Sequence, residues 1–129
     1  MHHRLLTLVA GILVAGLPLS AHHSFSSYYF EEQSMTITGE VQEFQYRSPH
    51  AIVMVNAPDA EGRMRTYAAE FASPNRLARE GVTKDTLKRG DMVVVTGSPG
   101  RTASEYKIHL KQIQRDADGW SWGSGRRRR

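Results

Sequence analysis

The chain has 129 residues, with 17 lysines and arginines against 13 aspartates and glutamates, and it contains no cysteine. This length corresponds to one ordinary domain. The lack of cysteine excludes a disulfide scaffold, a cysteine-ligated zinc site, an iron–sulfur cluster and a thiol nucleophile. Arg4 and the arginines at 126–129 account for five of the 17 basic residues, which leaves 12 against the 13 acidic ones. Because this body is nearly neutral, we expect no nucleic-acid-binding surface across the fold.

Residues 1–21 have the pattern of a secretory signal peptide. Arg4 provides a positive start, residues 5–19 form an apolar run, and Ser20 and Ala21 are small residues at its end. This run is shorter than the roughly 20 residues that cross a bilayer as a helix. We therefore expect cleavage after Ala21, no transmembrane anchor in the processed chain, and a periplasmic or secreted protein that begins at His22.

Five segments of the mature chain have the patterns of β-strands. They cover residues 34–46, 50–55, 63–72, 91–97 and 105–114. In the first segment the apolar positions change parity after Val41, which predicts a bulge. The continuous apolar run of the second segment predicts burial on both faces. Alternation in the third places Met64, Thr66, Ala68 and Glu70 on one face, which we take as the core face.

A short helix is predicted between the third and fourth strands. Ser73 is a typical N-cap, and Pro74 suits the first helical position. We expect the helix over residues 75–80, with Leu77 as its buried anchor. Five strands with such an insertion follow the order of an OB-fold, a small Greek-key barrel. A sandwich with the same number of strands is the alternative.

The predicted domain spans residues 22–115, and a tail follows it at 116–129. The tail combines Gly, Ser, Asp, two tryptophans and four arginines, with no hydrophobic periodicity. We expect it to be disordered. In the alternative interpretation it is an adhesive arm for anionic lipid, polysaccharide or a protein, with Trp120 and Trp122 as amphipathic anchors.

Four separated motifs resemble those of one family of small exported bacterial proteins. They are His22-His23-Ser24-Phe25, Ser48-Pro49-His50, Glu70-Phe71-Ala72-Ser73-Pro74-Asn75 and Leu87-Lys88-Arg89-Gly90-Asp91. Over residues 21–115 the chain resembles the domain of unknown function 6152 family, whose mature chains start with an Ala-His-His-Ser-Phe type of sequence. Family members often have Asn where this chain has Ser48, and the tail has no counterpart there. The resemblance implies an exported protein of an uncharacterised family and adds no activity.

The histidines near the predicted cleavage site are the main chemical signal. A free His22 would carry an α-amine and an imidazole that together chelate one metal ion. A second imidazole, for which His50 is the candidate, would complete a three-nitrogen histidine brace, and copper(II) favours such tetragonal nitrogen ligation. His23 is the competing ligand. If cleavage instead follows Ser20, His23 at position three forms an amino-terminal copper or nickel motif.

Structural alternatives accompany these histidines. A histidine pair after a cleavage site can simply be solvated, and His50 can be a turn residue that donates to a backbone carbonyl. Glu70 is either an acceptor that holds an imidazole N–H beside a metal, a ligand itself, or a capping or ion-pairing carboxylate. His109 lies on the same strand face as Lys107 and Lys111, so we expect it to be exposed.

Two functions follow as hypotheses. In the first, an exported OB-like domain binds copper(II) through His22 and His50 and acts as a metal carrier or sensor rather than an enzyme. In the second, a metal-free module holds another envelope protein through its barrel loops or its tail. The chain has no glycine-rich phosphate loop after a strand and no nucleophile elbow, so no catalytic residues are predicted.

Overall fold

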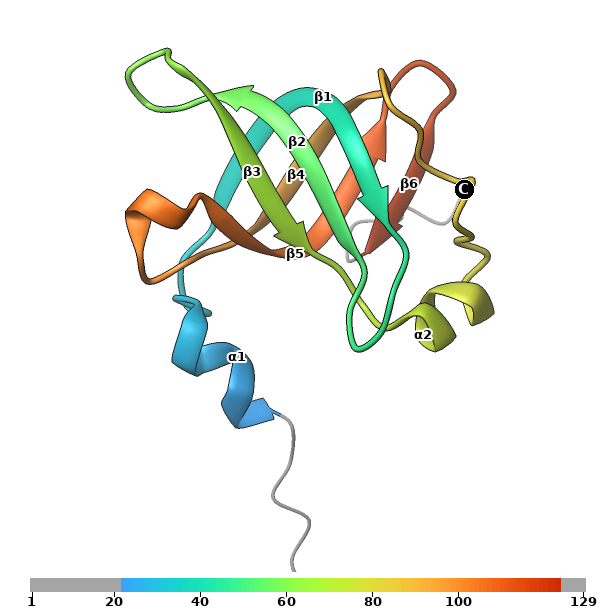
Figure 1. Cartoon of the computed structure of the whole chain (residues 1–129), viewed down its shortest axis with the longest axis horizontal. Helices are drawn as coiled ribbons and strands as arrows, with labels where there is room; N and C mark the ends of the chain where they lie inside the picture. The colour runs from blue at the N-terminus through green and yellow to red at the C-terminus, as the bar shows by residue number, and fades with distance from the viewer. Residues whose placement is uncertain (1–21, 124–129) are drawn as a thin grey trace, which may run out of the picture.

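The computed structural model describes the backbone of residues 22–123 and the side chains of residues 25–123. The predicted signal peptide and residues 124–129 of the tail lie outside the described residues. The chain enters through helix α1 (His22–Tyr28), and a second helix, α2 (Pro74–Arg79), lies between the third and fourth strands (Figure 1). A short 3₁₀ helix, η1 (Ala103–Glu105), precedes the fifth strand. The strands are β1 (Met35–Gln45), β2 (Ile52–Pro58), β3 (Met64–Glu70), β4 (Met92–Pro99), β5 (Lys107–Arg115) and β6 (Trp120–Gly123).

Strands β1 to β5 close into a barrel. β1 pairs antiparallel with β2 and β4, β2 pairs with β3, and β4 pairs with β5. The ring closes where β3 and β5 run parallel, with Ala68 opposite Lys107 and Glu70 opposite His109. This pairing, with a helix between β3 and β4, is that of an OB-fold. The predicted fold class is confirmed, and the sandwich alternative is excluded because the sheet closes on itself.

The predicted bulge in β1 is also confirmed. Val41 pairs with Val55 and Glu43 pairs with Met54, so the register shifts between them. The extra residue reverses which positions face the core, and it bends the strand so that β1 can pair with β2 along one half and with β4 along the other.

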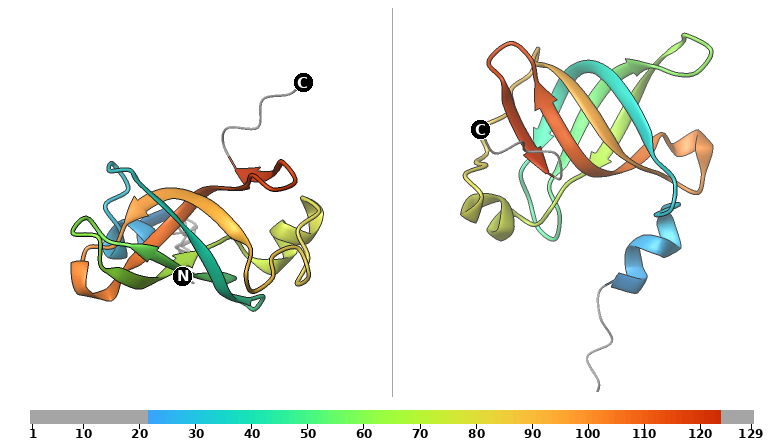
Figure 2. Two further views of the ribbon diagram at one scale, coloured as in Figure 1. Left: turned by 90° about the horizontal axis from the view of Figure 1, so that it is seen from above. Right: turned by 180° about the vertical axis from the view of Figure 1, so that it is seen from behind.

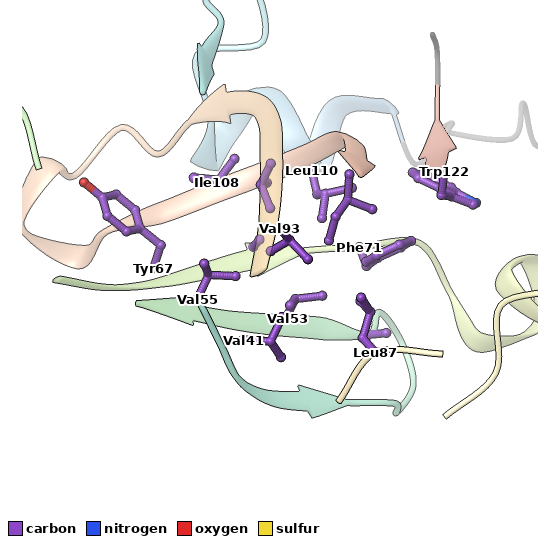
Figure 3. Close-up of a cluster of buried hydrophobic side chains, with 14 of the residues drawn as sticks. Val41, Val53, Val55, Tyr67, Phe71, Leu87, Val93, Ile108, Leu110 and Trp122 are labelled. Carbon is purple, nitrogen blue, oxygen red and sulfur yellow. The ribbon is translucent and has the colours of Figure 1, made fainter. Parts of the chain in front are cut away.

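The core lies inside the barrel and is built from alternate residues of its strands (Figure 3). In β2, Val53, Val55 and Ala57 are buried, while Ile52 and Met54 are only partly covered. The expected burial of this strand on both faces is therefore wrong. An antiparallel barrel strand needs only one apolar face, since its other face is turned away from the core.

The inward face of β3 is the opposite of the one predicted. Tyr67 and Ala69 are buried, as is Phe71 just after the strand, whereas Met64 is 63% exposed. Alternation defines two faces without saying which is inside, and here the bulkier apolar side chains decide. Glu70 therefore lies on the outer surface of the barrel, where it meets side chains from other segments.

Helix α2 forms as predicted. The Ser73 hydroxyl accepts a hydrogen bond from the Arg76 amide at 3.3 Å, Pro74 is the first helical residue, and Leu77 is fully buried. The Tyr46 hydroxyl contacts the carbonyl oxygens of Pro74 and Val82, each at 3.0 Å. These contacts hold α2 and the turn after it against the end of β1.

The tail differs from the disordered segment expected from residue 116 onward. Residues 120–123 form β6, which pairs antiparallel with β5 and lies on the same side of the molecule as α2 (Figure 2). Trp122 is 7% exposed, and its ring packs 4.7 Å from the ring of Phe71, centroid to centroid. Its Nε1 donates to Glu80 at the end of α2. The burial of Trp122 therefore fixes this segment against the core. A four-residue strand is too short to be recognised from hydrophobic periodicity.

Replacing Trp122 with Ala should destabilise the protein by roughly 3–5 kcal/mol, the usual cost of removing a buried tryptophan. Trp120, two residues earlier in β6, is only partly buried and is the matched control. Replacing Trp120 with Ala should reduce the free energy of unfolding by clearly less. Denaturant unfolding followed by circular dichroism measures both free energies, and equal losses would contradict the role assigned to Trp122.

Candidate functional site

Seven side chains from distant parts of the chain gather around two imidazole rings on the outer surface of the barrel. We call this group the two-histidine cluster: Phe25, Tyr29, Glu31, His50, Glu70, His109 and Lys111. The barrel closure brings its centre together, because Glu70 of β3 stands opposite His109 of β5. His50 joins them just before β2, where Ile52 pairs with Glu70.

Lys111 comes from β5, and the segment from α1 to β1 supplies the other three members, Phe25, Tyr29 and Glu31. The amide of Tyr29 donates to the carbonyl oxygen of Phe25 at 2.8 Å, and Tyr29 forms a β-bridge with Gly100. Tyr29 is buried. The end of α1 is therefore anchored to the loop after β4, and this anchor fixes the approach of Phe25 and Glu31 to the strands.

His50 is held by a carboxylate. Its Nδ1 lies 2.7 Å from Glu70 Oε1, while the Tyr29 hydroxyl donates to Glu70 Oε2 at 2.5 Å. A carboxylate oxygen accepts, so the imidazole nitrogen is the donor in this pair. The Nδ1–H tautomer leaves the lone pair of His50 on Nε2, which is the atom that would bind a metal ion or a proton.

His109 is held in the same way. Its Nδ1 lies 2.7 Å from Glu31 Oε1, and Lys111 Nζ donates to Glu31 Oε2 at 2.5 Å. Lys111 Nζ is also 3.0 Å from His109 Nδ1. A bare Nδ1 lone pair would face the Glu31 oxygen lone pairs at close range, so Nδ1 carries a proton and Lys111 donates to the carboxylate instead. The lone pair of the His109 ring is then on Nε2, as it is in His50.

Phe25 of α1 lies between the two imidazoles. Its ring is stacked on His109 with centroids 3.9 Å apart and planes 1° from parallel, and its centroid is 5.1 Å from that of His50. Both histidines and Phe25 line one pocket of about 210 Å³, which also reaches Trp122 and Arg76. We call it the two-histidine pocket. A small ligand in it would contact both imidazoles.

The pKa values of Tyr29 and Glu31 are shifted by their surroundings in the cluster. Burial raises the pKa of the Tyr29 hydroxyl, and its hydrogen bond to the Glu70 carboxylate raises it further, so Tyr29 remains a donor. For Glu31, burial acts to raise the pKa, but hydrogen bonds from Lys111 and His109 together bring it below its ordinary value. Glu31 therefore remains an ionised acceptor for His109.

The structure places only some of the predicted site residues in the two-histidine cluster. His50 and Glu70 are brought together, and Glu70 does hold an imidazole N–H, while its metal-related role stays a prediction. The side chains of His22 and His23 lie outside the described residues. The expected exposure of His109 is wrong: its side chain is 15% exposed because Phe25 covers it. Glu31 and Phe25 were not singled out, since no local spacing links them to residues about 80 and 25 positions away.

Within residues 25–123, no three side chains of His, Asp or Glu are grouped so that they could hold a metal ion by themselves. In the part of the chain that the structure describes, no helix is long and apolar enough to cross a membrane.

The family of this chain follows from its sequence. Residues 10–119 match a family of unknown function, DUF6152, and this span contains all five strands of the closed barrel. The chain belongs to the DUF6152 family. Nothing among curated proteins and nothing among solved structures matches it. Membership of DUF6152 carries no activity, so the two-histidine cluster is the evidence from which function is inferred.

The neutral forms of both histidines should be Nδ1–H tautomers in this DUF6152 protein. The reason is that a carboxylate oxygen lies 2.7 Å from each Nδ1. Long-range ¹H–¹⁵N correlation spectra distinguish the two tautomers by their nitrogen shifts. Glu70→Gln should perturb the His50 pattern and leave that of His109 unchanged, and an Nε2–H tautomer in the unmodified protein would contradict the assignment.

Replacing Glu31 with Gln should reduce stability at neutral pH but not in acid. The folded-state pKa of Glu31 lies below its unfolded value of about 4.3, so the ionised group stabilises the fold above that pH. This contribution is lost as the pH falls through the folded-state pKa. The stability difference between the two proteins, measured by urea unfolding, should therefore shrink below about pH 4. Glu32→Gln, at an exposed neighbour, should show no such trend.

Proposed function

We propose that this protein is an exported copper(II)-binding protein, a carrier or sensor, in which His22 at the processed N-terminus and His50 supply the nitrogen ligands. The observation that carries the proposal is the pair of carboxylate-anchored imidazoles under α1. Each has its Nδ1 at a carboxylate oxygen, which leaves the ring lone pair on Nε2, and both rings line the same pocket.

The support of each imidazole by a carboxylate is the arrangement that metal sites use. An imidazole that ligates a metal ion through one nitrogen usually donates its other N–H to a carboxylate, which fixes the ring and increases its basicity. Glu70 does this for His50, and the Tyr29 hydroxyl in turn fixes Glu70. Copper(II) favours nitrogen ligands in a tetragonal arrangement and binds them most tightly of the divalent first-row ions.

The position of α1 would bring the N-terminal ligand, His22, close to His50. Cleavage after Ala21 would leave His22 with both a free amine and an imidazole, three positions before Phe25. Three residues of helix span about 4.5 Å along the axis, and Phe25 contacts both imidazoles. The first residue of the processed chain would then begin close to the two-histidine pocket. His23 takes the place of His22 as the main anchor if cleavage follows Ser20.

His109 is a candidate for a further ligand beside the three-nitrogen brace. Phe25 is stacked on the face of its ring, whereas the lone pair of an imidazole nitrogen lies in the plane of the ring. The stacking therefore orients His109 without occupying the direction from which an ion would bind.

Copper(II) titration of the processed protein tests this function. Calorimetry gives the affinity, electron paramagnetic resonance counts the nitrogen ligands, and intact mass of the protein from its native compartment gives the first residue. His22→Ala and His50→Ala should each remove a nitrogen from the spectrum, and Glu70→Gln should weaken binding about 10–100-fold, the usual effect of losing a carboxylate behind a ligand.

Glu61→Gln, at an exposed carboxylate on the β2–β3 loop, is the matched control and should bind copper(II) as the unmodified protein does. A version that begins at Ala21 tests the amine itself, since it keeps both side chains and should change the spectrum. Affinity that is equal in the unmodified protein, His22→Ala and His50→Ala would overturn the proposal and leave a metal-free interaction module as the interpretation.

A further inference from the structure

A wider groove lies beside the two-histidine pocket, between α2 and the β5–β6 hairpin. It has a volume of about 830 Å³, and Arg79, Lys111 and Gly81 lie along it. Arg76, His109, Leu110 and Trp122 line both the groove and the two-histidine pocket. The two hollows are therefore adjacent and share a wall, and His50, the proposed copper ligand, does not line the larger one.

The groove carries positive charge that is held in place. Arg76 Nε donates to Glu80 Oε1 at 3.2 Å, and the Arg76 guanidinium lies over the Trp122 ring, 5.3 Å from its centroid. The other oxygen of Glu80 accepts from Trp122 Nε1. Both oxygens of Glu80 are thus used to fix Arg76 against the indole.

Donors remain open at the same place. Among the residues that the structure describes, the two terminal nitrogens of Arg76 have no hydrogen-bond partner, and Arg79 has no ion pair. The negative end of the α2 dipole accounts for basic residues in its last turn. It does not account for a guanidinium that is stacked on an indole with its outer edge free. That edge presents the planar fork that binds carboxylates in two hydrogen bonds.

The inner end of the groove has a different character. In the two-histidine pocket the walls include the rings of Phe25, Phe71 and Trp122 together with Leu110. Binding sites for small molecules typically combine such apolar walls with a few placed polar groups. The outer end is therefore suited to an anionic head and the inner end to a compact apolar body.

We propose that this groove binds a small aromatic carboxylate, whose carboxylate contacts Arg76 and Arg79 and whose ring enters the two-histidine pocket. The proposal does not rest on copper, because the charged contacts come from α2 and the apolar ones from the barrel and α1. An anion without an apolar body would meet only the outer half of the site, and a neutral ring only the inner half.

Benzoate binding to the metal-free protein, with a chelator present, tests the inference. Calorimetry gives the affinity, and tryptophan fluorescence in a Trp120→Phe background, where Trp122 is the remaining tryptophan, reports a ligand at the wall that the two hollows share. Benzamide has the same shape without the charge and should bind at least about tenfold more weakly, as the loss of a charge-assisted hydrogen bond implies. Inorganic phosphate should bind more weakly than benzoate, because it has no ring to enter the two-histidine pocket.

Variants distinguish the effect of an arginine in the groove from the effect of the protein's net positive charge. Arg79→Gln should weaken benzoate about tenfold, and Arg76→Lys, which keeps the charge without the planar fork, should also weaken it. Arg89→Gln removes the same charge from an exposed turn and should have no effect. Equal binding of benzoate and benzamide, or equal losses in Arg79→Gln and Arg89→Gln, would overturn the inference. Thermal unfolding of each variant shows that it is folded, and copper(II) affinity, measured separately, stays independent of the result.

Discussion

The parallel pairing of β3 with β5 is the constraint on which the rest of the structure depends. It turns an open sheet into a closed barrel, so that no long strand edge of the five-stranded ring remains unpaired. The same pairing sets Glu70 opposite His109 on the outer surface. Barrel closure and assembly of the site are thus one event, and a shift of this register by one residue would turn Glu70 or His109 toward the core.

The two-histidine cluster shows how a small barrel builds a polar site on its outside. Two imidazoles, two carboxylates, a phenol and an ammonium group satisfy one another, and in residues 25–123 no buried side-chain nitrogen or oxygen lacks a hydrogen-bond partner. Each ring is fixed through its Nδ1, and this tautomer leaves the lone pair of each ring on Nε2. Because these groups are hydrogen-bonded to one another, the charged residues can gather on the outer face of β3 and β5 and stay out of the apolar core.

The β6 strand extends this site beyond the five-stranded barrel. Trp122 fills space against Phe71, receives the guanidinium of Arg76 on its ring and donates to Glu80. One side chain thereby ties the end of the chain to α2 and forms the wall shared by the two hollows. A variant of Trp122 would therefore change stability together with the proposed ligand binding. Variants of Arg76 and Arg79 test the proposed binding separately.

The sequence by itself determined the family, the strand order, the α2 helix with its Ser73 cap, and the bulge after Val41, because each depends on residues that are neighbours in the chain. It also singled out His50 and Glu70, which the structure brings into contact, although Glu70 was chosen on the expectation that its face of β3 is the core face. It could not decide which face of β3 is inside, that Phe25 covers His109, or that residues 120–123 join the sheet. Those features depend on contacts between residues that are far apart in the chain, such as Phe25 with His109 and Trp122 with Phe71, and only the closed barrel decides which of the available apolar and charged side chains share a surface.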